Sequence, residues 1–157
     1  MITGANGNLG KRLLQNLLLN AYTEVVALVR SERAKSQIEG LPLEPQQRSR
    51  LDVVIADYAS KKDLQAAAEG VNYCVHLVGI LKETSDSTYE NAHEDSCQAL
   101  TEALQGGSTA HISYVSIVGA LETATNRCLK SKSIAGDMLL KSTTKTMVLR
   151  VPMVLGE

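Results

Sequence analysis

The 157-residue sequence contains no tryptophan, no phenylalanine and few cysteines, and each shortage excludes a class of protein. With five tyrosines as its only aromatic residues besides histidine, the chain lacks the stacking platforms that bind single-stranded nucleic acids. Three cysteines without a Cys-x-x-Cys pair provide neither a disulfide framework nor a zinc site. We therefore expect no nucleic-acid partner, no metal site, and reduced thiols in a cytoplasmic protein.

Long apolar runs and a strong net charge are also missing. No apolar stretch approaches the ~18 residues that a membrane span needs, and glycines begin at Gly4, so no signal peptide precedes the first motif. The formal net charge of −1 favours neither nucleic acid nor an anionic membrane surface as a general partner. A hydrophobic fraction of 44% is ordinary for a globular protein, and we expect residues 1–157 to form a single domain.

Strand-like and helix-like segments alternate along the chain, which is typical of an α/β fold with a parallel sheet. We expect a Rossmann-type, doubly wound sheet in the order 3-2-1-4-5-6, flanked by helices. Ser31 and Ser60 are predicted helix caps, Ser60 forming a capping box with Asp63. The segment 41–50 holds two of the three prolines and is predicted to be a loop. The predicted strands are 1–3, 24–30, 51–56, 71–78, 111–117 and 146–151, and the predicted helices are 9–20, 31–39, 60–69, 88–104 and 126–141.

Both ends of the chain are unusual for such a fold. The predicted first strand has about three residues, where about five are typical, and the chain stops just after the last predicted strand. We interpret both ends as cut, with a C-terminal substrate-binding region absent.

A Gly-x-x-Gly-x-x-Gly sequence lies between the first predicted strand and an apolar helix, at Gly4, Gly7 and Gly10. In a dinucleotide-binding unit the first glycine permits a tight turn, the second admits the pyrophosphate to the backbone, and the third allows close helix packing. The helix N-terminus offers unpaired N–H groups to the phosphates. The alternative is a glycine-rich turn without a ligand, but the strand before and the helix after favour a cofactor site. The intervening cofactor-binding candidates are Asn6, Asn8 and Leu9.

The end of the second predicted strand carries Arg30. Units that bind NAD usually place an acid there for the ribose 2′-hydroxyl, whereas an arginine accommodates the 2′-phosphate of NADP. Arg30 could form a bidentate contact with that phosphate, and Ser31 could add a hydroxyl donor. Alternatively, Arg30 is a solvated charge for which Glu32 competes. We predict NADP(H) as the cofactor, with NAD(H) as the alternative.

Taken together, these features resemble the short-chain dehydrogenase/reductase superfamily, in particular its extended and atypical members. Those members include NAD-dependent epimerase/dehydratase-like proteins and relatives of the NDUFA-nine-type accessory subunit of respiratory complex I. The segments that carry the resemblance are TGANGNLG at 3–10, AD at 56–57, HLVGIL at 76–81, TYENAHEDSCQALTEAL at 88–104, YVSIVGA at 114–120, CLKSK at 128–132 and LRVPMVLGE at 149–157.

The resemblance implies further cofactor contacts at the carboxyl edge of the sheet. Asp57 corresponds to the acid that binds the adenine amino group, although it could also be an ordinary acid before a helix. Gly79 ends the fourth predicted strand, where a side chain would obstruct a ribose, and could also be a simple turn glycine.

The resemblance also implies a catalytic set, which this sequence only partly contains. Members of the superfamily use a tyrosine as acid/base and a lysine four residues later that holds the nicotinamide ribose and lowers the tyrosine pKa. Lys132 matches the lysine, but Cys128 stands at the tyrosine position. Cys128 is either a small, half-buried residue, which we favour, or a thiolate activated by Lys132. Ser116 is the candidate substrate-positioning serine, although alignment on the strand instead places Ile117 there.

Other polar residues carry little functional signal. The spacing of Tyr58 and Lys62 also fits Tyr-x-x-x-Lys, but it follows the third strand, on the adenine side, and cannot face the nicotinamide. His76 and His111 are interpreted as strand residues of the core or its rim, and His93 as part of a solvated helix face.

Three functions remain open. The first is a protein that binds NADP(H) without turnover, for redox sensing or assembly. The second is an oxidoreductase or a nucleotide-sugar epimerase/dehydratase acting on an unknown small molecule, and the third is a truncated product that folds but binds poorly. A homodimer is a further expectation, because the edges of such domains often associate.

Overall fold

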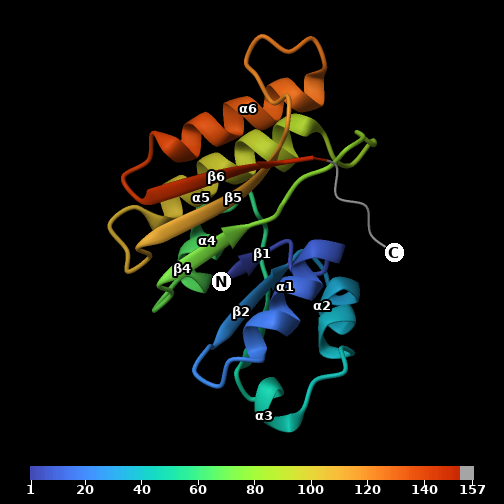
Figure 1. Cartoon of the computed structure of the whole chain (residues 1–157), viewed down its shortest axis with the longest axis vertical. Helices are drawn as coiled ribbons and strands as arrows, with labels where there is room; N and C mark the ends of the chain where they lie inside the picture. Colours follow the sequence, from blue (N-terminus) through green and yellow to red (C-terminus); the bar gives the residue numbers. More distant parts are fainter. Residues whose placement is uncertain (153–157) are drawn as a thin grey trace.

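The computed structural model describes residues 1–152, which form a six-stranded parallel sheet in the order β3-β2-β1-β4-β5-β6. Figure 1 shows the helices packed against this sheet. The predicted fold class is therefore confirmed. The strands are β1 (Ile2–Thr3), β2 (Val25–Val29), β3 (Leu51–Ile55), β4 (Tyr73–His76), β5 (His111–Ile117) and β6 (Lys145–Val151), and the helices are α1 (Asn8–Leu18), α2 (Glu32–Glu39), α3 (Pro45–Arg48), α4 (Lys61–Ala67), η1 (Glu90–Asp95), α5 (Ser96–Leu104) and α6 (Arg127–Leu140).

The short strand β1 occupies the centre of the sheet. Ile2 pairs with Ala27 of β2 on one side and with Val75 of β4 on the other. All pairings are parallel, so the carboxyl ends of the six strands meet at one edge. The order reverses between β1 and β4, which is where open α/β sheets bind ligands.

Two apolar cores lie on opposite faces of the sheet. Helices α1 and α2 cover the face that carries Ile2, Ala27 and Val29. Helices α4, α5 and α6 cover the other face, where Leu28, Leu100 and Tyr114 are buried. Alternate residues of each strand thus enter different cores, as the two-residue period of a strand requires.

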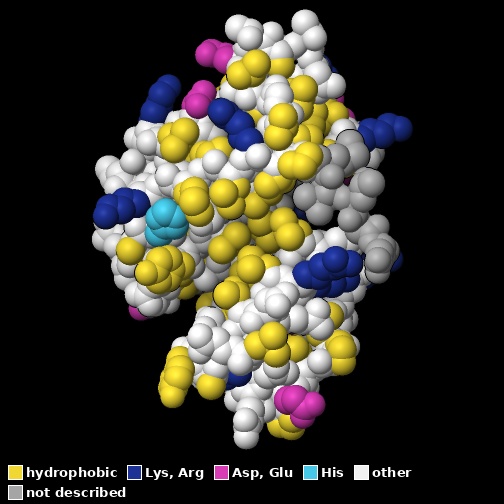
Figure 2. Space-filling model, viewed as in Figure 1, with side chains coloured by type: hydrophobic (Ala, Val, Ile, Leu, Met, Phe, Trp, Pro, Cys, Tyr) yellow, Lys and Arg dark blue, Asp and Glu magenta, His cyan; other side chains and the backbone are white. Residues whose placement is uncertain are grey.

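The face of β4, β5 and β6 opposite α6 is open among the described residues. Tyr73 is 67% exposed there, and Met147 and Leu149 are also exposed. Figure 2 shows hydrophobic side chains gathered across these strands. Within residues 1–152, no helix is long and apolar enough to cross a membrane, and no group of three His, Cys, Asp or Glu residues could hold a metal ion.

Two predicted elements need correction. The helix expected at 88–104 begins with a π-helix, η1, and becomes an α-helix only at Ser96. The loop expected at 41–50 contains the short helix α3, which Pro45 starts and a capping box between Glu44 and Gln47 stabilises. Residues 153–157, which end the family-like segment at 149–157, lie outside the described residues.

Candidate functional site

The glycine loop packs tightly against the end of β4 and the start of α1. Gly4 has a φ of +68°, and a Cβ at that position would lie 3.2 Å from the backbone carbon of Leu77. A Cβ on Gly10 would lie 2.6 Å from the carbonyl oxygens of both Gly4 and Ala5. The backbone conformation and the contact distances therefore require glycine at these two positions.

The first turn of α1 presents unpaired N–H groups beside this loop. The N–H of Gly7 donates to Gly4 at 3.0 Å, and the first helical bond runs from Lys11 to Gly7, also at 3.0 Å. The N–H groups of Asn8 and Leu9 precede that bond, and no side chain caps the helix. No acidic residue lies in the first turn, so the positive end of the helix dipole is not neutralised.

Tyr58 lies beneath the loop, a contact that its position after the third predicted strand did not indicate. Its hydroxyl accepts a hydrogen bond from the N–H of Gly4 at 2.9 Å and donates to the carbonyl of Leu28 at 2.7 Å. Tyr58 is not among the residues that line the pocket described below, in accord with its expected position away from the nicotinamide side.

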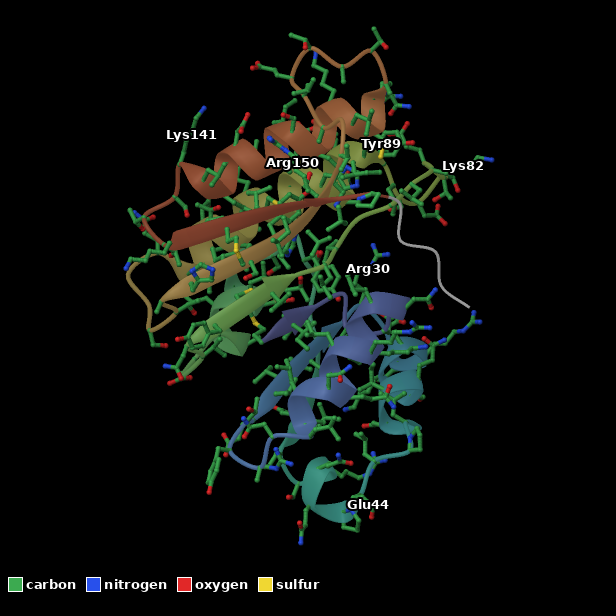
Figure 3. The ribbon with its side chains drawn as sticks, in the orientation of Figure 1. Arg30, Glu44, Lys82, Tyr89, Lys141 and Arg150 are labelled. Atoms are coloured by element: carbon green, nitrogen blue, oxygen red, sulfur yellow. The ribbon has the colours of Figure 1, made fainter. Side chains whose placement is uncertain are left out.

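Arg30 is exposed directly after β2, at the carboxyl edge of the sheet (Figure 3). Its guanidinium carbon lies 6.0 Å from the centre of the Tyr58 ring. Among the described residues Arg30 forms no salt bridge, so Glu32 does not compete for it. Ser31 caps α2 by accepting the N–H of Ala34 at 3.2 Å, as predicted.

Asp57 is exposed at the same edge, after β3. One of its carboxylate oxygens accepts the N–H of Ala59 at 3.0 Å. The capping box predicted for Ser60 and Asp63 is only half formed: Ser60 accepts the N–H of Asp63, whereas the Asp63 carboxylate accepts the N–H of Asp57. Asp63 thus fixes the backbone that carries Asp57.

A pocket of about 210 Å³ lies at the carboxyl edge, where the glycine loop meets the ends of β4, β5 and β6. Ser116 and Lys132 provide the only polar side chains among its lining residues. Larger hollows, among them two of about 500 and 710 Å³ at the amino edge of the sheet, lie away from the loop. We place the candidate site at the smaller pocket because ligands of open α/β sheets bind beyond the carboxyl ends of the strands.

Lys132 reaches this pocket from α6. Its Nζ donates to the carbonyl of Val115 at 3.3 Å and lies 4.9 Å from the centre of the Tyr114 ring. Burial lowers the pKa of Lys132. A Cβ on Gly79 would lie 2.6 Å from this Nζ, so the absence of a side chain at Gly79 makes room for the ammonium group.

Ser116 lies near the end of β5, only 3% exposed, and its hydroxyl has no hydrogen-bond partner among the described residues. A buried hydroxyl without a hydrogen-bond partner is energetically unfavourable unless a ligand or a water molecule forms the missing hydrogen bond. Ile117 also lines the pocket but has no polar side-chain atom. Of the two alternatives, Ser116 therefore has the chemistry to position a substrate oxygen.

Cys128 is buried at the start of α6 and does not line the pocket. Its Sγ donates to the carbonyl of Ile80 at 3.5 Å. Burial raises the pKa of Cys128, against the opposing effect of Lys132. The structure thus favours the small buried residue over the reactive thiolate.

The expectation for His93 was wrong, because this residue has no exposed surface. Its Nε2 accepts the N–H of Ile80 at 3.1 Å, which holds the segment at the mouth of the pocket. The sequence did contain a signal: Ser96, Cys97 and Leu100 follow at helical spacing and share its buried stripe. His76 is a core residue as expected, with Nδ1 2.8 Å from the Thr3 hydroxyl.

Comparison with known proteins agrees with this geometry. A family model described as NAD(P)H-binding matches residues 4–154, so the chain belongs to this family. The chain is 26% identical to ceramide reductase of Caulobacter vibrioides over 156 residues, which are 99% of this chain and 46% of that protein.

Solved structures share the fold. UDP-glucuronic acid 4-epimerase from Bacillus cereus in complex with NAD has a TM-score of 0.75 at 18% identity, over 95% of this chain and 55% of that one. The NADPH-dependent quinone oxidoreductase QOR2 of Escherichia coli, complexed with NADPH, has a TM-score of 0.69 at 22% identity, over 95% of this chain and 47% of that one.

The family model confirms the predicted nicotinamide-dinucleotide-binding domain, and the fold shared with an epimerase and a quinone oxidoreductase agrees with the predicted resemblance to the short-chain dehydrogenase/reductase superfamily. It spans about half the length of the curated relatives that it matches.

Proposed function

We propose that this domain binds NADP(H) in preference to NAD(H), and that it serves as a binding or redox-sensing unit. The observation that carries the preference is Arg30, exposed at the end of β2 without a carboxylate partner among the described residues. A guanidinium in this position favours a 2′-phosphate, whereas an acid would favour a 2′-hydroxyl.

Different residues at the carboxyl edge of the sheet would bind different parts of the cofactor. The N–H groups of Asn8 and Leu9 would face the pyrophosphate, and Arg30 would face the 2′-phosphate. Asp57 would accept from the adenine amino group, and Lys132, beside Gly79, would hold the nicotinamide ribose. When bound, the reduced cofactor supplies a hydride at the pocket. Two observations support the binding of this cofactor by these residues. The Ser116 hydroxyl has no hydrogen-bond partner among the described residues, and the glycine loop leaves no room for side chains at Gly4 and Gly10.

The pocket offers no phenol among its described lining residues, which supports a role other than tyrosine-dependent chemistry. Cys128, at the position of that phenol, directs its thiol to the carbonyl of Ile80. A thiol with a raised pKa is a weak hydrogen-bond donor and reaches less far than a tyrosine.

Charge reversal at Arg30 tests the cofactor preference. We expect Arg30→Asp to weaken NADPH binding at least tenfold more than NADH binding, because it replaces an attractive charge with a repulsive one. Lys141→Asp is the matched control, since Lys141 ends α6 away from the site (Figure 3). Equal losses for the two cofactors in Arg30→Asp would contradict the assignment.

A second candidate function is an NADP(H)-dependent oxidoreductase, favoured by Ser116 and Lys132 lining the same pocket. In carbonyl reduction the carbonyl carbon would receive the hydride, and the oxygen would receive a proton from the Lys132 ammonium or from water held by Ser116. Because the other lining side chains are apolar and the relative named above is a ceramide reductase, a long-chain ketone is the first substrate to try. NADPH oxidation that depends on this ketone and disappears in Lys132→Ala would support turnover, and no oxidation would favour the binding role.

A further inference from the structure

Tyr58 joins two parts of the cofactor site that are far apart in the sequence. It follows β3, and it is only 5% exposed, between the glycine loop and the end of β2. Tyr58 has no role in the proposed function so far, because it lies outside the pocket that Lys132 lines.

The hydroxyl of Tyr58 ties the start of the glycine loop to β2. It accepts from the N–H of Gly4 at 2.9 Å and donates to the carbonyl of Leu28 at 2.7 Å. The same carbonyl accepts the N–H of Ala5 at 3.2 Å. Burial raises the pKa of Tyr58 to about 12, so the hydroxyl keeps the proton that it donates. Phenylalanine at this position would leave the N–H of Gly4 without its partner.

The ring of Tyr58 lies next to the guanidinium of Arg30. The Arg30 carbon Cζ is 6.0 Å from the ring centre, within the range of a cation–π attraction. The Arg30 guanidinium forms no salt bridge with another described residue, so the Tyr58 ring provides its cation–π contact without a competing carboxylate within residues 1–152. One side chain therefore contacts both the loop proposed to hold the pyrophosphate and the residue proposed to read the 2′-phosphate.

We propose that Tyr58 is a positioning residue for cofactor selection: its hydroxyl sets the glycine loop, and its ring orients Arg30 toward the 2′-phosphate. This inference rests on the proposed preference for NADP(H). The hydroxyl and the ring have separable effects. The hydroxyl acts through the glycine loop, which would contact both cofactors, whereas the ring acts through Arg30, which would distinguish between them.

Two substitutions separate the effects. Tyr58→Phe removes the hydroxyl and keeps the ring, and we expect it to weaken NADPH and NADH binding each about fivefold, because the hydroxyl's one hydrogen bond to the glycine loop is lost. Tyr58→Leu also removes the ring, and we expect it to lower the NADPH-to-NADH preference two- to fivefold, whereas Tyr58→Phe should leave this preference unchanged. Dissociation constants from nicotinamide fluorescence give both quantities. Tyr73→Phe and Tyr73→Leu, at the opposite edge of the sheet, are the matched controls and should bind as the wild type does.

The ratio of the two affinities distinguishes positioning from a purely structural role. If Tyr58→Phe binds both cofactors as tightly as the wild type, or if Tyr58→Leu keeps the wild-type preference and only melts earlier, the inference is overturned. Should Tyr58→Leu not fold, Tyr58→Met provides the ring-free variant. A wild type that binds NADH as tightly as NADPH would instead refute the proposed preference, and the role of the ring with it.

Discussion

Two buried histidines should make the stability of this fold depend steeply on pH between 7 and 5. Burial, with an added contribution from Lys132, lowers the pKa of His76 to about 3 and that of His93 to about 4. Both imidazoles are therefore neutral in the folded chain, whereas in the unfolded chain they take up protons around their ordinary pKa of 6.5. The unfolded state then binds more protons below pH 6.5, so acid favours unfolding.

The size of this loss of stability follows from the difference in histidine pKa between the folded and the unfolded chain. At pH 5 the unfolded histidines lie about 1.5 pH units below their pKa, and each unit corresponds to about 1.4 kcal/mol. Each buried histidine should therefore lower the free energy of unfolding by about 2 kcal/mol on going from pH 7.5 to pH 5, and the pair by about 4 kcal/mol. For a chain of this size, that corresponds to a melting temperature roughly 8–16 °C lower.

Urea unfolding at a series of pH values measures this loss directly. His93→Gln keeps an acceptor for the N–H of Ile80 but cannot be protonated, so about half of the pH-dependent loss should disappear. His111→Gln, at the half-buried start of β5, is the control and should keep the full loss. A His93→Gln variant as acid-sensitive as the wild type would refute the reasoning.

Three further predictions concern the loop, the missing phenol and a helix end. Gly10→Ala should destabilise the fold by about 1–3 kcal/mol and weaken binding of both nicotinamide cofactors, because its Cβ would meet two carbonyl oxygens at 2.6 Å; unchanged urea unfolding and cofactor titrations would contradict this. If only the phenol is missing, Cys128→Tyr should raise NADPH-dependent ketone reduction at least tenfold, whereas Cys128→Phe should not, and equal rates would count against it. Arg50→Leu should lower the free energy of unfolding by about 1–2 kcal/mol, because Arg50 donates to the carbonyl of Leu18 at the end of α1 and to two carbonyls of the turn that follows, at 2.6–2.8 Å; exposed Arg12→Leu should be near neutral in the same unfolding assay.

The overall fold was predictable because local patterns and topology agree. The alternation of β-branched runs with amphipathic helices, together with the strand, loop and helix around Gly4, limits the chain to a doubly wound sheet. The structure confirms that sheet order. The strand expected at 111–117 is β5 without change, because alternate residues such as Ile112 and Tyr114 enter the core.

The errors arose where tertiary packing decides local structure. A π-helix is rare and is defined by its i→i+5 hydrogen bonds, which the periodicity of the sequence at 88–104 did not reveal. The acidic neighbours of His93 suggested a solvated face, although packing buries this residue. The Asp63 carboxylate also binds a backbone N–H before the helix, that of Asp57, instead of the Ser60 N–H that a capping box requires.

The candidate site was partly accessible from the sequence. Arg30 was placed at the carboxyl edge because it follows a predicted strand of a parallel sheet, whereas Ser116 and Lys132 were suggested by the resemblance to a known superfamily. The contacts of Tyr58 were not accessible, because the spacing of this residue in the chain says nothing about the loop above it. Only the structure brings its hydroxyl to Gly4.

The central claim is that this domain selects NADP(H), and titration of the unmodified chain into NADPH and NADH tests it most directly. The absence of tryptophan keeps the fluorescence of the protein low, so the reduced nicotinamide can be followed without interference. We predict saturable binding of NADPH that is at least tenfold tighter than that of NADH. Equal affinities, or tighter binding of NADH, would contradict the role proposed for Arg30.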